Sequence, residues 1–318
     1  MPLGGARLSQ LSQLHIPVLL NEVVDSFSSL KDKMNLVYFD GTFGRGGHFR
    51  EVKKKYSIDL ALIADQDDEA ISSACKEWSD LIEKKHLKIY HSSFLQFALD
   101  NKTALDLILL DLGVSSPQLD QPSRGFSFNK LGPLDMRMNQ TLKKSAADLI
   151  NELEHDELMK IFKDYGEVEN PFHVIKAIIQ DRVSTPFKTT LQLASLIERV
   201  EGWKKKGFHP ATQYFMALRL VVNQELEILQ QALPLLIDQL QDGGRFSVIT
   251  FHSLEDRIVK NIFKDDEKGF LVNKKVIVPS EEECRINVRA RSAKLRIFQK
   301  GQKPEKPDKF AARRALRA

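Results

Sequence analysis

The chain has only two cysteines among its 318 residues, Cys75 and Cys284, and they form no CxxC pair. This excludes a disulfide framework and a cysteine zinc ribbon, and a reduced, cytoplasmic compartment is expected. No run of about 18 apolar residues is present, so no transmembrane helix is predicted. Residues 1–13 lack the apolar core of a secretory signal, and we interpret them as a flexible leader. No group of His, Cys or carboxylate residues has metal-ligand spacing, so no metal site is predicted.

The net charge of +4 is unevenly distributed along the chain. Residues 285–318 contain 12 Lys or Arg but only two acidic residues, which leaves the rest of the chain net acidic. A basic tail of this kind can neutralise the phosphates of a nucleic acid and release their counterions. Charge alone leaves open a second interpretation, a solvated tail that only aids solubility. Residues 301–318, rich in Lys, Pro and Arg, are expected to be flexible.

Five short apolar runs predict buried strands of a parallel sheet, because a strand covered on both faces loses its polar–apolar alternation. The runs are 36–39, 60–64, 87–90, 105–110 and 246–251. Helices are predicted between them, with 17–30 ahead of the first strand and 66–78 after the second. This order predicts an α/β fold with a Rossmann-like, doubly wound sheet. Two later runs, 276–278 and 295–298, are expected to form its last strand pair.

The alternation breaks between Asp111, at the end of the fourth run, and Phe246, at the start of the fifth. The 134 residues between them are far more than a crossover needs, so an inserted unit is predicted. Helical periodicity covers 145–165, 171–181 and 189–201, and one long helix is expected from 209 to about Leu240 as the crossover of the sheet. The predicted division is a discontinuous sheet domain, 14–118 and 211–300, and an all-helical insert, 119–210.

A glycine-rich loop, Asp40–His48 (DGTFGRGGH), directly follows the first predicted strand. Its glycines let the backbone approach a ligand closely at the carboxyl edge of the sheet. A dinucleotide fingerprint starting at Gly44 would place Phe49 where close packing requires a small residue. Asp40 would repel a pyrophosphate, whereas it could offset the positive sulfonium of S-adenosylmethionine. The loop therefore favours a methyltransferase over a dehydrogenase.

Two residues near the next strand ends fit an adenosyl group. Asp65 ends the second predicted strand and could accept the hydrogen bonds of both ribose hydroxyls, although a helix-capping role fits the same position. Phe94 follows the third strand and could stack on adenine, but a core aromatic is the competing interpretation. The sequence leaves both alternatives open.

The fourth predicted strand ends in DLGVSSPQ, from Asp111 to Gln118. In enzymes that methylate exocyclic amines, an acid or amide at this point accepts the N–H groups of the amine, whose lone pair is otherwise delocalised into the ring. Asp111 supplies the acid, but the proline pair and the aromatic residue usual in those enzymes are absent. We take Asp111, Ser115 and Ser116 as catalytic candidates. The cysteines lie outside every motif, which argues against a cysteine nucleophile.

The motifs together resemble the bacterial 16S ribosomal RNA cytosine-N4 methyltransferases (the RsmH, or MraW, family) from about His15 to Phe298. They are HIPVLLNE (His15–Glu22), DGTFGRGGH (Asp40–His48), LLDLGVSSPQL (Leu109–Leu119), RGFSF (Arg124–Phe128), GPLDMRM (Gly132–Met138), HPAT (His209–Thr212), VNQEL (Val222–Leu226), FHSLEDRIVK (Phe251–Lys260) and RARS (Arg289–Ser292). The resemblance implies a class I S-adenosylmethionine-dependent methyltransferase sheet with a helical substrate-recognition insert. It also implies N4-methylation of a cytidine in the decoding centre of the small ribosomal subunit. The predicted cofactor site comprises Asp40, Gly44, Gly46, Gly47, His48, Asp65, Phe94, Asp111 and Gln118.

His252 follows the fifth predicted strand and overlooks the same sheet edge as Asp111. It could hydrogen-bond a flipped base or accept a proton during turnover. Equally, it could be a buried histidine satisfied by Glu255 or Asp256.

Four arginines are candidates for RNA contact. Arg289 and Arg291 have the spacing of one strand face, and the surrounding charge favours phosphate binding. Arg137 either pairs with Asp135 or contacts phosphate, and Arg257 belongs to the motif after the fifth strand. The expected partner is 16S rRNA or the small ribosomal subunit, with the protein as a monomer or homodimer and without a membrane. A non-catalytic assembly factor that binds rRNA is the alternative function.

Overall fold

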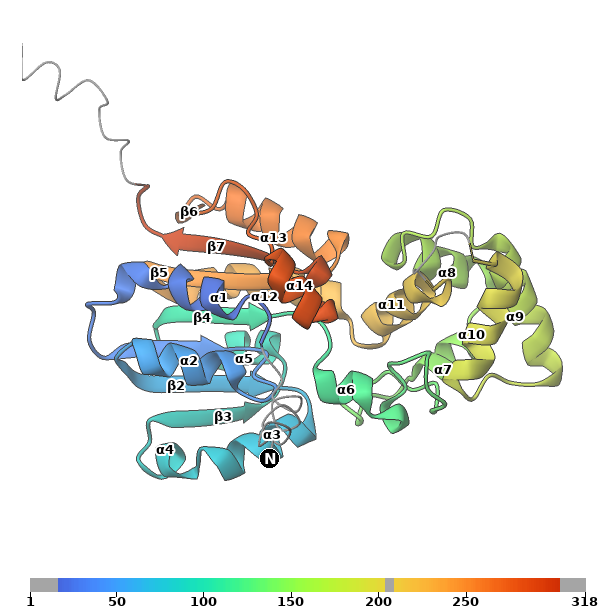
Figure 1. The fold of residues 1–318 in the computed structure, drawn as a ribbon, viewed down its shortest axis with the longest axis horizontal. Helices are drawn as coiled ribbons and strands as arrows, with labels where there is room; N and C mark the ends of the chain where they lie inside the picture. Colours follow the sequence, from blue (N-terminus) through green and yellow to red (C-terminus); the bar gives the residue numbers. More distant parts are fainter. Residues whose placement is uncertain (1–16, 204–208, 304–318) are drawn as a thin grey trace, which may run out of the picture.

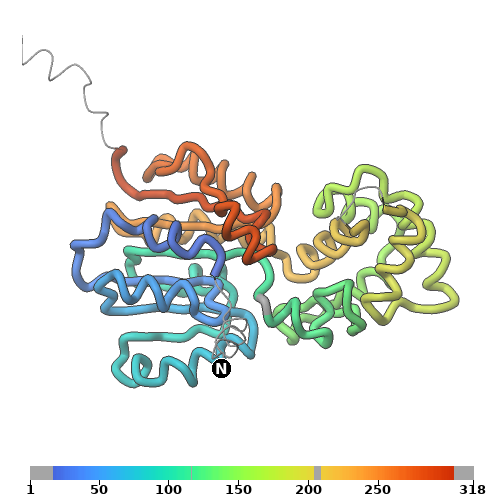
Figure 2. The backbone as a smooth tube through the Cα atoms, in the orientation of Figure 1, coloured from blue at the N-terminus to red at the C-terminus, as the bar shows by residue number. Residues whose placement is uncertain are grey.

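The computed structural model describes residues 17–203 and 209–303. Within these ranges the chain forms a sheet unit flanked by helices and a smaller helical unit beside it (Figure 1). The tube in Figure 2 shows the chain leaving the sheet unit after β4 (Leu105–Asp111) and returning to it at α12 (Glu225–Gln239). The smaller unit is therefore an insert within the sheet unit.

Seven strands form one sheet in the order β3-β2-β1-β4-β5-β7-β6. They are β1 (Leu36–Asp40), β2 (Ile58–Asp65), β3 (Leu87–His91), β4, β5 (Leu240–Thr250), β6 (Gly269–Leu271) and β7 (Lys294–Lys300). Strand β7 runs antiparallel to β5 and β6, and the other pairs are parallel. The predicted Rossmann-like α/β sheet is confirmed, and all five predicted parallel strands form, although β5 begins earlier than expected.

The outer strand pair differs from the expectation. Strand β7 forms where it was predicted, but its outer partner is β6 and not the apolar run at 276–278. Within that run Ile277 makes only an isolated bridge to Leu295. The next residue but one is Pro279, which has no N–H to donate and cannot continue a ladder. The run is therefore apolar without being a strand.

The helices of the sheet unit cover both faces of the sheet. They are α1 (Leu20–Ser26), α2 (Gly47–Lys55), α3 (Asp68–Glu77), α4 (Ser79–Glu83), α5 (Phe94–Asp100), α12, α13 (Ser253–Asp265) and α14 (Glu281–Ile286), with the 3-10 turns η2 (Ser28–Leu30) and η5 (Val288–Ser292). In β4, Leu107 and Leu109 pack in the core with α1, α2 and α3. The alternate residues Ile108 and Leu110 pack in the opposite core with α5, α12 and α13. Burial on both faces explains why the strands are continuous apolar runs in the sequence.

The insert is built from short helices around a core of its own. They are α6 (Ser116–Asp120), α7 (Ala146–Glu152), α8 (His155–Lys160), α9 (Phe172–Ser184), α10 (Thr190–Glu201) and α11 (Ala211–Val222), with the 3-10 turn η3 (Pro122–Arg124) and the π-helical turn η4 (Ile161–Tyr165). Ile150, Phe162, Ile175 and Leu193 are fully buried in this core. The all-helical insert is confirmed. No helix in the described ranges is long and apolar enough to cross a membrane.

The long helix expected from 209 to about Leu240 is instead two helices, α11 and α12. Between them Gln224 has a left-handed backbone, with φ of 52°, which an α-helix cannot continue through. Phe215 and Leu218 of α11 belong to the core of the insert, whereas Leu229 of α12 belongs to the sheet unit. By packing, α11 is thus part of the insert, and the two units divide near Asn223 and not at residue 210.

Candidate active site

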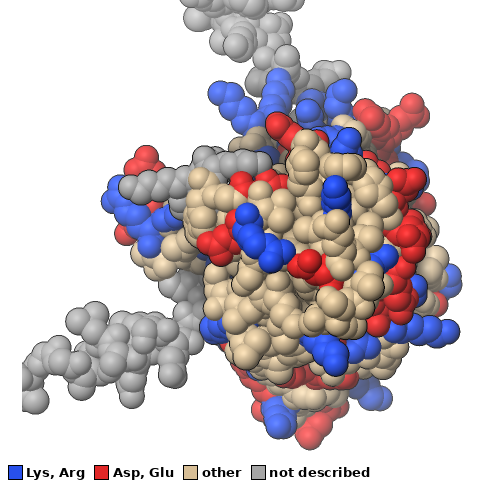
Figure 3. Space-filling view, turned by 90° about the vertical axis from the view of Figure 1, so that its right-hand side faces the viewer, with Lys and Arg blue, Asp and Glu red and all other residues tan. Residues whose placement is uncertain are grey.

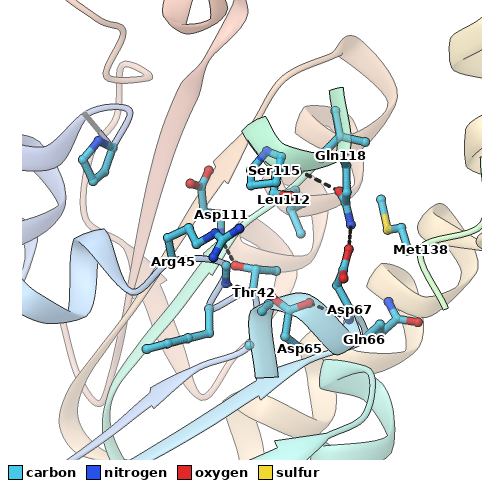
Figure 4. A pocket seen from close by; sticks show the side chains of 18 of the residues that line it. Thr42, Arg45, Asp65, Gln66, Asp67, Asp111, Leu112, Ser115, Gln118 and Met138 are labelled. Atoms are coloured by element: carbon cyan, nitrogen blue, oxygen red, sulfur yellow. Dashed lines mark hydrogen bonds between the residues drawn. The ribbon is translucent and has the colours of Figure 1, made fainter. Parts of the chain in front are cut away.

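A cavity of about 660 Å³ opens at the carboxyl ends of β1, β2 and β4. The chain runs outward from β1 to β3 and returns to β4 on the other side of β1, so the sheet order switches direction here. Open α/β sheets bind ligands at this point, and the volume is typical of small-molecule sites. In Figure 4, Asp65, Asp111 and Gln118 surround the same space, with Met138 of the insert facing them.

The glycine-rich loop forms one wall of the cavity, but several of its amides are already hydrogen-bonded within the protein. Gly44 N donates to Oδ2 of Asp65 at 2.8 Å. Thr42 N donates to Oδ1 of Asp40, and Phe43 N donates to a β2 carbonyl oxygen. These amides are therefore not directed at a ligand pyrophosphate, which agrees with the choice of a methyltransferase over a dinucleotide enzyme.

Asp65, at the end of β2, lines the cavity. Its Oδ2 accepts from Gly44 N and its Oδ1 accepts from Asp67 N at 2.9 Å, so each oxygen retains the capacity for a second hydrogen bond. Burial raises the pKa of Asp65, and the backbone hydrogen bonds from Asp67 and Gly44 oppose that effect. The helix-capping role falls to Asp67, whose Oδ1 accepts from Glu69 N. Asp65 thus remains available for ribose hydroxyls.

Phe94, Gly46 and Gly47 take part in the packing around the cavity, and two of them also line it. Phe94 is part of the sheet core and also lines the cavity, so its stacking on adenine stays a prediction. Gly46 has φ of 67° and precedes α2, a conformation that a side chain would strain. A Cβ on Gly47 would lie 2.4 Å from Cγ of Pro17. Only Gly47 of this glycine pair lines the cavity.

Asp40 and His48 lie behind the cavity wall and not in it. Asp40 is 2% exposed and accepts a hydrogen bond from Tyr38 Oη at 3.0 Å. Burial raises the pKa of Asp40 to about 7. His48 Nε2 lies 2.9 Å from the carbonyl oxygen of Val18, and its Nδ1 lies 3.8 Å from Oδ2 of Asp111. Both predicted cofactor residues are therefore placed to act through their neighbours in the wall.

Asp111, at the end of β4, reaches the cavity. Its backbone N donates to Oγ1 of Thr42 at 2.6 Å, which fixes the strand end against the loop. Oδ1 of its carboxyl group is buried and has no hydrogen-bond partner. Burial, together with the charges of Asp40 and Glu255, raises the pKa of Asp111 to about 8. Because an unpaired buried acceptor is costly, Oδ1 marks where the N–H group or positive charge of a ligand is expected.

Gln118 joins the cavity wall to the insert. Its Oε1 accepts from Ser115 N at 2.9 Å and its Nε2 donates to Oδ2 of Asp67 at 2.8 Å (Figure 4). The same Asp67 oxygen accepts from Arg124 Nη1 at 2.8 Å, in an ion pair whose side chains are 8% and 7% exposed. Arg124 Nη2 also donates to the carbonyl oxygen of Met138. One buried hydrogen-bond network thus links the cavity wall at the end of β2 with the first turns of the insert.

The return connection is held in the same way. Oδ1 of Asn223 accepts from Met138 N and its Nδ2 donates to the carbonyl oxygen of Met136, both at 2.8 Å. Glu225 lines the cavity and accepts two hydrogen bonds from Arg219, at 2.8 and 3.0 Å. Burial raises the pKa of Glu225, although the charge of Arg219 opposes this. Buried polar contacts therefore fix both connections between the units.

The other catalytic candidates differ in position. Ser115 lines the cavity as the residue before α6, and Ser116 begins α6 with a side chain outside the described part of the structure. His252 does not line the cavity. Its Nε2 lies 3.0 Å from Oε1 of Glu255 without the alignment of a hydrogen bond, and Glu255 N donates to its Nδ1 at 3.5 Å, which favours the alternative of a histidine in contact with Glu255. Burial acts to raise the pKa of Glu255, but His252 and Arg219 outweigh it and hold this pKa below its usual value.

Arg137 is held inside the insert. Its Nε and Nη2 donate to the two carboxylate oxygens of Asp135 at 2.8 and 2.7 Å, and its Nη1 donates to the carbonyl oxygen of Leu142. With three of its groups bound in this way, the structure supports the ion-pair interpretation of Arg137 over phosphate contact.

The remaining arginines lie on the sheet unit. Arg289 lines the mouth of the cavity and pairs with Asp120, whereas Arg257 pairs with Glu167. The expectation that Arg289 and Arg291 share one strand face is wrong, because both lie in the 3-10 turn η5, which has three residues per turn. Arg291 is exposed, and its Nε donates to a backbone carbonyl of α14.

Residues 12–301 match the family described as the MraW methylase family. The chain is 55% identical to the ribosomal RNA small subunit methyltransferase H of Bdellovibrio bacteriovorus, over 93% of this chain and 90% of that protein. The chain belongs to the MraW methylase family. Proteins with the same name from Shewanella woodyi and Legionella pneumophila are 43% and 44% identical, over 90% of this chain and 97% and 98% of theirs. The family resemblance seen in the sequence is confirmed.

A methylase must hold a methyl donor, and the residues of this cavity fit S-adenosylmethionine. The carboxylates that line it are Asp65, Asp67, Glu77, Asp111, Asp120, Glu225 and Glu255. They outnumber the lining arginines, Arg45, Arg50 and Arg289. An acidic cavity suits a sulfonium cation, and the unpaired Oδ1 of Asp111 leaves a position for it or for the amine it alkylates.

Several residues of this methylase site had no assigned role in the sequence. They are Thr42, Asp67, Arg124, Asn223 and Glu225. All except Asp67 belong to the quoted motifs, so motif membership was the available signal. Asp67 lies in the helix predicted over 66–78, but it is the N-cap residue before α3 and its Oδ1 accepts from Glu69 N.

Proposed function

We propose that this methylase transfers a methyl group from S-adenosylmethionine to the N4 amine of a cytidine in the decoding centre (the P site) of 16S rRNA. The observation that carries the proposal is the buried, unpartnered Oδ1 of Asp111 in the wall of a cavity between the two units. The name of the relatives, ribosomal RNA small subunit methyltransferase H, supports small-subunit rRNA as the polymer. The chemistry of a carboxylate acceptor supports an exocyclic amine as the methylated group.

The sheet unit holds the donor. Asp65 would accept hydrogen bonds from the ribose hydroxyls and Phe94 would cover the adenine, because both line the cavity together with Gly44 and Gly47 of the glycine loop. Bound S-adenosylmethionine supplies an electrophilic methyl group on a positively charged sulfur. The acidic wall stabilises that charge, and most strongly where burial keeps water away.

Asp111 orients the acceptor. Its carboxylate accepts an N–H of the amine, which favours a lone pair localised on nitrogen and directed at the methyl carbon. The raised pKa of Asp111 also suits it to take the proton that the nitrogen loses after transfer. Transfer is direct and in line, with positioning as the main source of rate. Neither Cys75 nor Cys284 lines the cavity, so no cysteine is placed for a covalent intermediate.

The RNA must present its base to a buried group. Because Asp111 lies inside the cavity, the cytidine leaves its stack to reach it, as in other enzymes that act on bases. Arg257, Arg289 and Arg291 contact phosphates, whereas Arg137 keeps its role within the insert. Residues 304–318 of the basic tail lie outside the described residues. We place the protein in the cytoplasm with the small ribosomal subunit.

Two experiments test the function. Calorimetry with S-adenosylmethionine is expected to show one site per chain, whereas absence of binding would favour the non-catalytic assembly factor. Methylated cytidines are then mapped in 16S rRNA from cells with and without the protein. One N4-methyl group is expected to disappear without it and to return with the wild-type chain but not with Asp111→Ala. An unchanged methylation pattern would overturn the proposal.

A further inference from the structure

Two exposed ion pairs bridge the sheet unit and the insert, and the residues of the first of them line the cavity. Arg289 Nη2 donates to Oδ1 of Asp120 at 2.7 Å. Arg257 Nη2 donates to Oε1 of Glu167 at 3.4 Å. In both pairs the arginine belongs to the sheet unit and the carboxylate to the insert or its first helix. Both arginines were predicted from the sequence to contact RNA.

Glu167 is held in place by groups other than its arginine. Its backbone is left-handed, with φ of 49°, which is unfavourable for a residue with a side chain. Gln213 Nε2 donates to the carbonyl oxygens of Gly166 and Glu167, both at 3.1 Å. Ser253 Oγ, at the start of α13, donates to the second carboxylate oxygen of Glu167. The insert therefore presents this carboxylate to α13 in a fixed position.

Both bridges are easy to exchange. The side chains of Arg289 and Asp120 are 41% and 60% exposed, and those of Arg257 and Glu167 are 62% and 40% exposed. Exposed pairs of this kind contribute little to folding stability. A phosphate, by contrast, binds an arginine fork through two charge-assisted hydrogen bonds. A nucleic-acid backbone can thus replace either carboxylate at small cost.

The insert offers few other places where an RNA backbone could bind, so Arg289 and Arg257 are the stronger candidates for phosphate contact. On the face of the insert seen in Figure 3, most of the surface is tan, and the blue Lys and Arg side chains are scattered and form no continuous basic patch. Arg289, in contrast, lines the cavity, whereas Arg257 lies outside it on α13, the helix that carries Glu255 of the cavity wall. An RNA strand that places a base in the cavity would pass Arg289, and a neighbouring part of the strand would reach Arg257.

We propose that the two bridges form a phosphate-exchange interface, in which backbone phosphates of the RNA replace Asp120 on Arg289 and Glu167 on Arg257. The inference rests on the proposed function, since it takes RNA as the partner. Before RNA arrives, the carboxylates keep the arginines oriented and reduce binding of polyanions that do not reach the cavity. Entry of the RNA frees the insert from both bridges while the buried Arg124–Asp67 pair still holds it.

The test is equilibrium binding of the full-length protein to small-subunit rRNA over a salt series. Asp120→Asn and Glu167→Gln are each expected to bind about two- to fivefold more tightly at low salt, because each removes the group that competes with phosphate. Arg289→Ala is expected to bind more weakly and to flatten the slope of log affinity against log salt by about 0.7. The matched control is Asp238→Asn, which breaks an exposed pair with Lys268 at the opposite edge of the sheet and is expected to change neither quantity.

The double variant Asp120→Asn/Arg289→Ala decides the mechanism. Exchange predicts that it binds like Arg289→Ala alone, since Asp120 then has no arginine to release. If Asp120→Asn strengthens binding equally without Arg289, simple repulsion explains the gain and the inference is overturned. Weaker RNA binding by Asp120→Asn would show that the Asp120–Arg289 pair is a structural contact that supports RNA binding, and this result would also overturn the inference. Thermal melting and cofactor calorimetry check that the variants fold, and failure of the proposed function appears separately, as wild-type protein that does not bind the rRNA.

Discussion

The sheet unit and the helical insert hold themselves together in different ways. In the sheet unit a central strand such as β4 is buried on both faces, and helices from distant parts of the chain share two cores. The insert has one core, made of short helices and of the π-helical turn η4, which contributes Ile161 and Phe162. Between them run two chain connections and a small set of polar contacts. The coupling between the units is therefore concentrated in a few residues, and several of them, among them Asp67, Asn223 and Glu225, also line the cavity.

Arg124→Met breaks the buried contact between the two regions and is expected to have the largest effect on stability. It leaves Asp67 buried without its cation, which typically costs about 3–5 kcal/mol. Chemical denaturation measures the loss. Arg199→Met is the matched control, because it breaks an exposed pair with Asp181 inside the insert and is expected to cost about 1 kcal/mol or less. Equal losses for the two variants would contradict the assigned role of the buried pair.

Asp111→Asn sharpens the comparison by separating donor binding from transfer. The amide keeps the shape of the side chain but not its charge, so the rate of transfer is expected to fall about 10²–10³-fold, as for other groups that act on a developing charge. Binding of S-adenosylmethionine is expected to weaken with the loss of this charge but not to disappear, because Asp65 and Phe94 still line the cavity. Single-turnover transfer and calorimetry measure the two effects. Near-normal turnover would remove Asp111 from the mechanism.

The acidic cavity predicts that the affinity for S-adenosylmethionine, which carries a sulfonium cation, depends on pH more strongly than the affinity for S-adenosylhomocysteine, which lacks that charge. The pKa values of Asp40 and Asp111 are raised to about 7 and about 8, so both groups are largely neutral at pH 6 in the ligand-free protein. A bound sulfonium favours their ionised forms. Affinity for S-adenosylmethionine is therefore expected to rise about tenfold or more from pH 6 to pH 8, whereas affinity for S-adenosylhomocysteine stays nearly constant. Parallel pH curves for the two ligands would refute this account.

The same two groups affect folding in the opposite direction. Because their pKa values are raised above the unfolded value, the stability they contribute is complete at low pH and is lost as pH rises through about 7 and 8. The ligand-free protein is thus expected to lose unfolding free energy between pH 6 and pH 9, and bound S-adenosylmethionine to reduce that loss. Denaturation curves at the two pH values, with and without the ligand, check the sign.

Arg137→Gln is expected to have the smallest effect on RNA. Its guanidinium is used by Asp135 and by the carbonyl oxygen of Leu142, so RNA affinity is expected to change less than about twofold, while the insert loses stability. Filter binding beside Arg289→Ala gives the contrast. An equally large loss of RNA affinity for both variants would show that Arg137 contacts the RNA.

The sheet could be predicted from the sequence because its determinants are local. Each parallel strand is a short apolar run, and the glycine loop follows β1 directly. The insert was less predictable. The apolar stripe over α11 and α12 is continuous in the sequence, but its two halves face different cores, and only the left-handed Gln224 separates them. The single helix predicted over 145–165 is likewise divided. A second helix, α8, begins after Glu154, and the side chain of Glu157 accepts a hydrogen bond from the backbone N of Glu154.

The candidate site could be predicted only in part, for a related reason. Asp65, Asp111 and the glycine loop lie at strand ends, and topology alone brings those together. The contacts between Asp67 and Arg124 and between Met138 and Asn223 join positions 57 and 85 residues apart. No periodicity encodes such pairs, because they depend on how the insert sits on the sheet unit.

The most direct test of the account is the chemical identity of the methylated nucleoside. Purified protein is given S-adenosylmethionine with a labelled methyl group and small ribosomal subunits from cells that lack the protein, and the rRNA is digested and analysed by mass spectrometry. The account predicts label in N4-methylcytidine, one per rRNA, and its loss with Asp111→Asn. Label on carbon 5 of cytosine or on a ribose hydroxyl would contradict the role given to the Asp111 carboxylate and to the cavity between the two units.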